Sequence, residues 1–433
     1  MIAATDPRTL VAQGHTRGAD ATLRIAGVNT VELAQIYGTP LVVFDADTFR
    51  SNVDGFLSAA LPHGISVAYA AKAFLVTRLA ARIAQYPELE LDVCSLGEIA
   101  TAERGGFPAS RMYLQGCGKT AEELGAAIAG RVQFIVVDGI DELSDLAARA
   151  GERRVNVALR INTGIDVHTH DFVRTGGENT KFGILPADVP QALAVLDKHP
   201  SLVLAGLHAH MGSQIFDEAP FATNLDALMD IAAALSASGR RVGRLLLGGG
   251  FGVDEDIAAQ GRLDLATLLG GLAARAEQRS SALGIAAPRL GIEPGRALAA
   301  TAGTTLYRIA AIKNSGRRRF VVIDGSIADN PRPAIYGAYH QPVVAQSAAR
   351  GELVPVTIAG RSCENDEMVD ARLPDDLRAG DLLALCTTGA YTYAMASNYN
   401  RFGRPAVVEV ESGGHRLLAR RENTEDVMRN DVL

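Results

Sequence analysis

The sequence predicts two domains, an α/β domain built as a (β/α)8 TIM-type barrel and an all-β domain. Three observations support this prediction: a length of 433 residues, a series of apolar runs that alternate with amphipathic stretches, and a change of pattern after about residue 300. A chain of this length exceeds the size at which one hydrophobic core usually suffices. We therefore place the barrel at residues 45–298 and the second domain at residues 1–44 and 299–433.

Short apolar runs rich in β-branched residues recur through the first two thirds of the chain. They are ISVAYAAK (65–72), ELDVCS (90–95), RMYLQG (111–116), FIVVDG (134–139), VNVALRIN (155–162), LAGLHAHMG (204–212), RLLLGGG (244–250) and RLGIEPG (289–295). Stretches between them, such as EIATAERGG, have the apolar spacing of amphipathic helices. Buried parallel strands separated by helices produce this pattern, and eight units within about 240 residues match a barrel. A doubly wound open sheet is the alternative.

The pattern changes after about residue 300. Strand-like runs joined by Gly, Pro and Asn turns follow one another with little helix between them. These runs are TLYRIAAIKN, RFVVIDGS, HQPVVAQ, ELVPVTIAG, DLLALCTT and PAVVEVES. They predict a second, all-β domain at the C-terminal end, and the strand-like TPLVVFD near the N-terminus could add to it.

Composition and charge restrict the class of function. The net charge of −7 is spread along the chain, which argues against nucleic acid or an anionic membrane as the main partner. No apolar run approaches the roughly 18 residues of a membrane span, and the N-terminus has no secretory pattern. The four cysteines (Cys94, Cys117, Cys363 and Cys386) fall at no disulfide or zinc spacing. We therefore expect a cytoplasmic protein with reduced thiols.

Polar residues interrupt the apolar runs at their C-terminal ends, where barrel enzymes carry their chemistry. The residues are Lys72, Asp92, Ser95, Arg160, Asn162, His210, Ser213, Gly248, Gly249, Gly250, Glu293 and Arg296. Chance would distribute them over both ends of the barrel and the helices. Their convergence predicts one site at this end.

Three of these groups have a chemistry of their own. Lys72 is flanked by apolar residues in VAYAAKAF, and a desolvated lysine amine is suited to Schiff-base formation. The glycines of LLLGGGFG offer backbone N–H groups to a phosphate, although a tight turn would need them equally. In IEPGR, Glu293 suits a pyridine nitrogen and Arg296 suits a phosphate or carboxylate. An internal Glu–Arg ion pair is the alternative for this motif.

Two H-x-H pairs raise the question of a metal. His208 and His210 lie in HAHMGSQI, and His168 and His170 lie in a polar connection. Neither pair has a third ligand at convincing spacing, so we expect no metal site. We expect the His210 imidazole to stack on a cofactor ring, and residues 166–182 to form a long active-site loop.

Three polar islands interrupt the strands of the β domain. They contain Arg332 and Tyr336 in DNPRPAIYGAYH, Cys363 and Glu364 in AGRSCENDEMVD, and Tyr391 in TTGAYTYAMASNYN. A cysteine beside a glutamate provides a proton donor and a ligand for an ammonium group. A solvated turn is the alternative for each island.

Taken together, these residues resemble the alanine-racemase-like, fold-type III family of pyridoxal phosphate-dependent decarboxylases. The motifs YAAKA, HAHMGSQI, LGGGFG, EPGR, RPAIYGAYH, SCEN and GAYTYAMASNYN occur in the family's order over nearly the whole chain. The similarity is greatest to the branch that converts meso-diaminopimelate to L-lysine and CO2, the last step of lysine biosynthesis. The resemblance implies a barrel with a C-terminal β-sandwich that includes the N-terminal segment. It also implies pyridoxal 5'-phosphate as cofactor and a homodimer with shared active sites.

The resemblance also implies a role for each matched residue. Lys72 is similar to the Schiff-base lysine, His210 to the residue stacked on the ring, and Glu293 to the pyridinium partner. The implied cofactor ligands are Lys72, Asp92, His210, Ser213, Gly249, Gly250, Glu293, Gly295, Arg296 and Tyr391. The implied substrate ligands are Arg296, Arg332, Tyr336, Glu364 and Tyr391, with Cys363 as the proton donor from the second subunit.

Two segments depart from the family pattern. GRSCEND places Arg361 and Asn365 beside the catalytic pair, and TYAMASN follows GAY where Gly-Phe-Ser-Met is more usual. Both lie where the substrate is selected. A related decarboxylase of another basic or modified amino acid (ornithine, lysine or arginine type) in a secondary pathway is therefore an alternative. A racemase and a cofactor-free regulator are the others, and retention of Lys72, Glu293 and Cys363 argues against the regulator.

Overall fold

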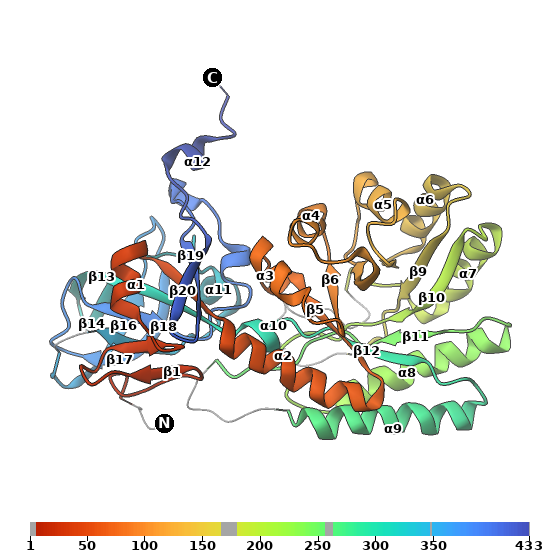
Figure 1. The fold of residues 1–433 in the computed structure, drawn as a ribbon, viewed down its shortest axis with the longest axis horizontal. Coiled ribbons are helices and arrows are strands. Elements are labelled where there is room, and N and C mark those ends of the chain that lie inside the picture. Colours follow the sequence, from red (N-terminus) through yellow and green to blue (C-terminus); the bar gives the residue numbers. More distant parts are fainter. Residues whose placement is uncertain (1–5, 166–179, 256–262, 347–348, 433) are drawn as a thin grey trace. The chain divides into compact units, whose positions relative to one another are not determined.

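The structure is a computed structural model, and it describes residues 6–165, 180–255, 263–346 and 349–432. These residues divide into two compact units, whose elements are labelled in Figure 1. The first unit comprises the described parts of Val53–Gly252 and Arg262–Gly295. The second comprises those of Met1–Asn52, Val253–Gly261 and Arg296–Leu433. Within the described parts of the chain, no helix is both long and apolar enough to cross a membrane.

The first unit is a closed barrel of eight parallel strands. In chain order they are β5 (Ser66–Ala70), β6 (Leu89–Val93), β7 (Met112–Leu114), β8 (Phe134–Val137), β9 (Val155–Arg160), β10 (Leu202–His208), β11 (Arg244–Leu246) and β12 (Arg289–Ile292). β12 pairs with β5, with Gly291 opposite Ser66, which closes the sheet. All eight strands predicted from the apolar runs are confirmed, and the open-sheet alternative is wrong because the sheet has no free edge.

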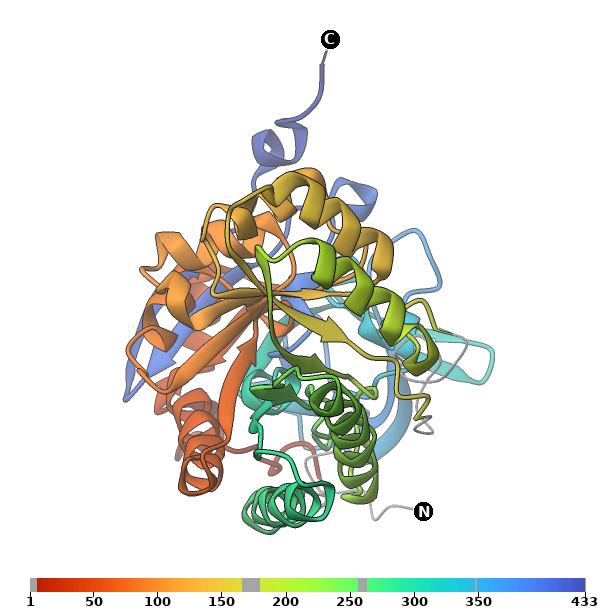
Figure 2. The same ribbon diagram turned by 90° about the vertical axis from the view of Figure 1, so that its right-hand side faces the viewer.

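Helices surround the barrel strands, as Figure 2 shows in a view along the barrel. They are α3 (Thr77–Ile83), α4 (Leu96–Arg104), α5 (Ala121–Ile128), α6 (Ile140–Ala150), α7 (Val189–Lys198), α8 (Ala219–Ala237) and α9 (Leu265–Leu283), and α2 (Ala46–Ala60) precedes β5. Polar residues in the connections after β6 and β7 cap the helices that follow. Ser95 accepts a hydrogen bond from the Glu98 N–H at the start of α4, and Thr120 forms a capping box with Glu123 at α5. Ser95 therefore has a structural role at its strand end.

The second unit is built mainly of sheet. Its strands are β4 (Leu41–Asp45), β13 (Gly303–Ser315), β14 (Arg318–Ile323), β15 (Pro342–Gln346), β16 (Leu353–Ala359), β17 (Glu367–Pro374), β18 (Leu382–Leu385), β19 (Ala406–Glu411) and β20 (Gly414–Ala419). They run in the order β17-β16-β14-β13-β4-β19-β20, with β18 pairing β13 and β15. A smaller sheet is formed by β1 (His15–Arg17), β2 (Leu23–Ile25) and β3 (Val28–Asn29). The short helices are α1 (Thr30–Tyr37), α10 (Arg296–Ala299), α11 (Arg332–Tyr336) and α12 (Thr424–Met428).

Successive residues of the central strands point to opposite faces of the sheet, and each face is covered by its own hydrophobic core. On β18, Leu382 and Ala384 pack in one core, and Leu383 and Leu385 pack in another. The first core also receives Leu33 of α1. The strand-like segment near the N-terminus is β4, which pairs with β13 and β19. The predicted contribution of the N-terminal segment to the β domain is therefore confirmed.

Candidate functional site

Three buried polar side chains meet inside the barrel. The Tyr113 hydroxyl of β7 donates a hydrogen bond of 2.8 Å to Glu293 Oε1. His208 Nε2, at the end of β10, lies 3.1 Å from Glu293 Oε2. Glu293 follows β12 directly, so side chains from three strands converge on one carboxylate. Buried polar groups normally satisfy one another in this way, and the arrangement fixes the orientation of the carboxylate.

Charge keeps Glu293 ionised in spite of its burial. Burial by itself raises the pKa of a carboxyl, but the nearby His208 and Lys72, together with the Tyr113 hydroxyl, outweigh it and lower the pKa of Glu293 to about 2. The neighbouring Asp92 behaves in the opposite way. Burial and the Glu293 charge raise the pKa of Asp92 well above its usual value, and Lys72 offsets only part of this. The pair therefore consists of one fixed anion and one carboxyl that readily holds a proton.

Lys72 lies on a short 3-10 turn, Ala71–Ala73, directly after β5. Its charge acts on Asp92, Glu293 and His210, so it stands close to this polar cluster. Gly295 packs against the same turn, and a Cβ there would lie 3.2 Å from that of Ala73. A larger residue in place of Gly295 would therefore press on the segment that carries Lys72.

His210 follows β10 and is neutral. Burial first, and then the charges of Lys72 and Arg160, lower the pKa of His210 well below its usual range. The Gly249 N–H donates to His210 Nδ1 at 3.2 Å, which leaves the ring proton on Nε2. The strand ends at His208, so the two histidines of HAHMGSQI have different environments and different partners.

The glycine loop after β11 lies beside the loop after β10. Ile215 and Phe251 form a parallel bridge between them, and the Ile215 N–H donates to the Gly250 carbonyl at 2.9 Å. A Cβ on Gly249 would come within 2.2 Å of the Glu293 carbonyl oxygen, and Gly250 has a φ of +92°. Only glycine fits this close approach. Ser213, two residues before Ile215, is thereby placed in the loop that adjoins the glycines.

Two arginines of the β unit share one carboxylate. Glu255 Oε1 lies 2.6 Å from Arg332 Nη2 and 3.6 Å from Arg296 Nη1. Its other oxygen accepts the Tyr339 N–H at 3.1 Å. We name Arg296, Arg332 and Glu255 the arginine cluster. Glu255 was not among the residues predicted from the sequence, although the glycine loop that precedes it was.

Aromatic residues of the β unit adjoin the arginine cluster. The Tyr391 ring lies 4.9 Å from the Arg296 guanidinium, a cation–π contact. Tyr391 has a φ of +59°, which costs free energy in an aromatic residue and is often found at functional sites. Tyr336 stands four residues after Arg332 on α11, hence on the same face of the helix, and its hydroxyl lies 3.9 Å from the Met395 sulfur.

Cys363 and Glu364 lie on the exposed loop between β16 and β17. The Cys363 N–H donates to Asn400 Oδ1 at 2.9 Å, and the Tyr399 hydroxyl donates to Glu364 Oε1. The two unusual neighbours are engaged elsewhere. The Arg361 guanidinium lies 4.4 Å above the Phe402 ring, and the Asn365 amide donates to Glu367 at 2.9 Å.

Sequence reasoning missed Tyr113 and Glu255. Tyr113 is a polar-tipped residue inside a predicted barrel strand, which is the only signal that the sequence offers for it. His168 and His170, with most of the loop predicted at 166–182, lie outside the described residues.

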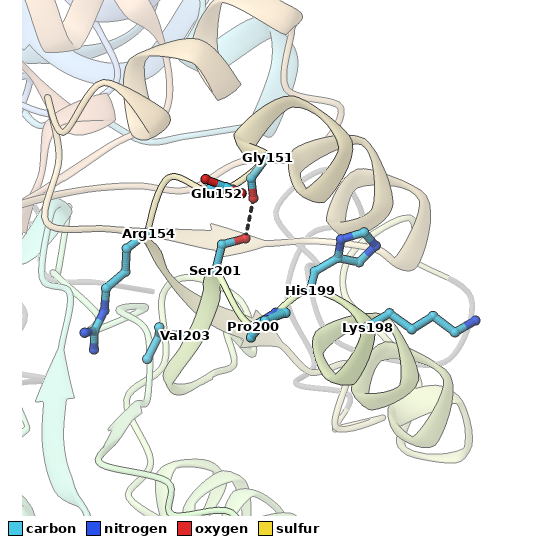
Figure 3. Close-up of a pocket in the computed structure, with 8 residues that line it drawn as sticks. All are labelled: Gly151, Glu152, Arg154, Lys198, His199, Pro200, Ser201 and Val203. Carbon is cyan, nitrogen blue, oxygen red and sulfur yellow. Dashed lines mark hydrogen bonds between the residues drawn. The ribbon is translucent and has the colours of Figure 1, made fainter.

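A separate hollow of about 620 Å³ lies at the opposite ends of β9 and β10 (Figure 3). Its charged lining residues Glu152, Arg154 and Lys198 are exposed, and the Ser201 hydroxyl donates to the Gly151 carbonyl at 2.7 Å. Because buried, convergent polar groups mark a chemical site, this hollow does not resemble one.

Comparison with known proteins agrees with this geometry. Residues 50–300 match the family described as "Pyridoxal-dependent decarboxylase, pyridoxal binding domain". The diaminopimelate decarboxylase of Actinosynnema pretiosum subsp. auranticum is 42% identical over 421 residues, covering 96% of this chain and 94% of the relative. That of Bacillus subtilis (strain 168) is 38% identical over 426 residues and covers 95% of each chain.

Solved structures give the same result. The diaminopimelate decarboxylase of M. jannaschii, in complex with L-lysine, superposes with a TM-score of 0.88 at 30% identity and covers 98% of both chains. The Helicobacter pylori enzyme, also in complex with L-lysine, gives a TM-score of 0.84 at 28% identity and covers 93% of this chain and 98% of that one. The chain belongs to the family of pyridoxal-dependent decarboxylases.

Proposed function

We propose that this protein decarboxylates meso-diaminopimelate to L-lysine and CO2. The observation that carries the proposal is the 42% identity over 96% of the chain with a diaminopimelate decarboxylase. Two similar structures are complexes with L-lysine, the product of that reaction. The arginine cluster adds a chemical reason, because arginine is suited to binding the distal carboxylate that lysine and ornithine lack.

The barrel residues suit pyridoxal phosphate. Lys72 supplies an amine among buried carboxylates, Glu293 supplies a permanent negative charge, and His210 supplies a neutral ring. Asp92 Oδ1 is buried and has no hydrogen-bond partner among the described residues, so a further polar group would be accommodated there. When bound, the cofactor supplies an electron sink for the pair released as the carbon–carboxylate bond breaks.

Each barrel residue then has a task. Lys72 would hold the cofactor covalently, and the ionised Glu293 would favour a protonated pyridine nitrogen. His210 presents a flat, uncharged ring for stacking, because its Nδ1 is already bonded to the Gly249 N–H. Ser213, Gly249 and Gly250 lie on adjoining loops that offer a hydroxyl and backbone N–H groups to the phosphate.

The β unit supplies the substrate ligands. Arg332 and Arg296, with Tyr336, bind the distal carboxylate, and Tyr391 contacts both cofactor and substrate. Cys363 donates its thiol proton to the carbon that has lost CO2, and solvent returns a proton to the thiolate afterwards.

We further propose a cytoplasmic homodimer in which Cys363 and Glu364 complete the active site of the second subunit. Their loop is exposed within one chain, which supports a role outside the chain that carries it. Mixing a Lys72→Ala variant with a Cys363→Ala variant tests this directly. If the site is shared, mixed dimers contain an intact site and recover part of the activity. A mixture as inactive as its components would count against a shared site.

The first test of the function is CO2 release from cofactor-loaded protein offered meso-diaminopimelate, L-lysine, L-ornithine or L-arginine separately. We expect release with meso-diaminopimelate alone, and its loss in Lys72→Ala together with loss of the visible absorption of the bound cofactor. Release with only another amino acid would keep the cofactor site and assign the protein to a related decarboxylase. Visible absorption without turnover of any amino acid would refute the decarboxylase function itself.

A further inference from the structure

The carboxylate of Glu255 occupies the guanidinium edge that the proposed function assigns to the substrate. Arginine Nε and Nη2 form one side of the guanidinium, the side that grips a carboxylate with two parallel hydrogen bonds. Glu255 Oε1 bonds Arg332 Nη2 at 2.6 Å. Arg332 Nε is buried and has no hydrogen-bond partner among the described residues. Glu255 therefore binds only one of the two donors that this edge offers to a carboxylate.

The arginine cluster needs an anion whether or not a substrate is bound. The side chains of Arg332 and Arg296 are only 4% and 8% exposed. Burial and the repulsion from Arg332 lower the pKa of Arg296, which shows that the two cations oppose each other. Glu255 is 14% exposed and contributes the negative charge that compensates one of them. Within the arginine cluster itself, two guanidinium groups and one carboxylate leave a net positive charge that favours a further carboxylate.

A carboxylate that binds Arg332 with both oxygens would satisfy Nε as well as Nη2. Leaving a buried donor without a partner is costly, so the two-pronged ligand has an advantage over Glu255. Two carboxylates on the same guanidinium edge would repel each other, and both need Nη2. The Tyr339 N–H, 3.1 Å from the other Glu255 oxygen, does not depend on Arg332 and can retain the displaced side chain.

We propose that Glu255 is a specificity-determining residue, an internal ligand that the distal carboxylate of the substrate displaces from Arg332. The inference rests on the proposed function, because that function places a distal carboxylate at the arginine cluster. Glu255 lowers the apparent affinity for every distal carboxylate and selects those able to take both Nε and Nη2. A substrate without a distal carboxylate gains nothing from removing Glu255.

The test compares Glu255→Gln with wild-type holoenzyme. Gln has the same shape and lacks the charge, so we expect KM for meso-diaminopimelate to fall by about three- to tenfold, with a smaller change in kcat. The inhibition constant of L-lysine, used as a product inhibitor, should stay the same or rise slightly. Glu411→Gln is the matched control, because Glu411 forms ion pairs with Arg50 and Arg416 in the same unit. It should change none of these values.

A binding measurement separates this inference from the proposed function. Pimelate, a seven-carbon dicarboxylate without amino groups, is titrated calorimetrically into wild type, Glu255→Gln and Glu255→Ala, with thermal midpoints measured to verify folding. We expect both variants to bind pimelate more tightly than wild type, even if the enzyme turns out to act on another amino acid. Equal or weaker binding, or a raised KM in Glu255→Gln, would show that Glu255 positions Arg332 and would overturn the displacement.

Discussion

Two buried carboxyl groups, Glu293 in the barrel and Asp329 in the β unit, each accept a tyrosine hydroxyl and yet have pKa values shifted in opposite directions. Glu293 is 4% exposed and accepts the Tyr113 hydroxyl at 2.8 Å. Asp329 is 8% exposed and accepts the Tyr307 hydroxyl at 2.7 Å. The pKa of Glu293 is lowered to about 2, whereas burial raises the pKa of Asp329 to about 7.

Charged neighbours account for the difference. Burial raises both pKa values, but His208 and Lys72 stand close to Glu293 and favour its anion. Among the charged neighbours of Asp329, Asp324 and Asp366 have the largest effect and disfavour its anion, and Arg421 acts in the opposite sense without outweighing them. The Tyr307 hydroxyl and the Ser326 N–H offset only part of the burial. A tyrosine donor alone therefore does not keep a buried carboxyl ionised. A fixed negative charge, as a cofactor nitrogen requires, needs a cation beside it.

The largest effect is expected from Glu293→Gln. The amide preserves the shape but cannot hold a ring nitrogen protonated, so we expect kcat to fall by about 10³-fold, or about 4 kcal/mol. CO2 release under saturating substrate measures it. The visible absorption of the bound cofactor should shift in position while the cofactor remains attached through Lys72.

Asp329→Asn is the matched control for Glu293→Gln. It removes the same kind of group from the β unit, and because Asp329 has no proposed contact with substrate or cofactor, kcat should stay within about twofold. A fall in kcat as large as that of Glu293→Gln would mean that Asp329 also takes part in catalysis.

Asp329 should instead make the free energy of unfolding depend on pH. Its folded-state pKa of about 7 exceeds the ordinary value of 3.8, so between these values the folded protein holds a proton that the unfolded chain releases. The free energy of unfolding therefore falls as pH rises from about 4 to about 7. At about 1.4 kcal/mol per pH unit the ceiling is about 4 kcal/mol, and we expect about half of it because buried sites relax on ionisation.

The measurement is the difference in thermal midpoint between Asp329→Asn and wild type at a series of pH values. Asparagine cannot titrate, so the thermal midpoint of the variant should rise steadily relative to that of wild type as pH increases through this window. A difference that is constant with pH, or that moves the other way, would show that Asp329 is ionised in the folded protein.

His208→Gln should have an intermediate effect. His208 is the main neighbour that lowers the pKa of Glu293, and glutamine retains an N–H donor but cannot carry a positive charge. The pKa of Glu293 should rise, and the acidic limb of the kcat profile should move upward toward about pH 5, with about a tenfold loss at its acid end. Above pH 8 the variant should approach wild type. A uniform loss at all pH values would indicate a packing defect instead.

The fold was largely predictable because buried strands carry a strong apolar signal. All eight barrel strands appear as runs such as 134–139, apolar on both faces. The strands of the large sheet that were missed, β17 and β20, are its two ends and carry charged residues, as in EMVDARLP. The three short strands of the smaller sheet, β1, β2 and β3, were missed as well. An edge strand is open to solvent on one side, so its sequence does not show the alternation that identifies an inner strand.

Candidate site residues were predictable where position along a strand decides their direction, and not where the partner lies elsewhere in the chain. Lys72 and Glu293 follow apolar runs directly, and a barrel directs such residues to one end. The partnership of Glu293 with Tyr113 depends on the register of distant strands. The contact of Glu255 with Arg332 depends on how the chain after the glycine loop meets α11, which no local pattern indicates.

The smallest effect, and the sharpest test of the comparison, comes from removing the two tyrosine hydroxyls. The Tyr113 hydrogen bond is the weakest of the influences named for Glu293, whereas the Tyr307 hydrogen bond is the strongest that favours the Asp329 anion. Tyr113→Phe should therefore cost kcat only about threefold, because His208 and Lys72 still hold Glu293 ionised. Tyr307→Phe should move the pH window of Asp329 upward, beyond about 7, as measured by thermal midpoints. A large rise in the pKa of Glu293 in Tyr113→Phe, seen as an acidic limb of the kcat profile displaced toward neutral pH, would mean that the tyrosine, and not the neighbouring charges, keeps Glu293 ionised.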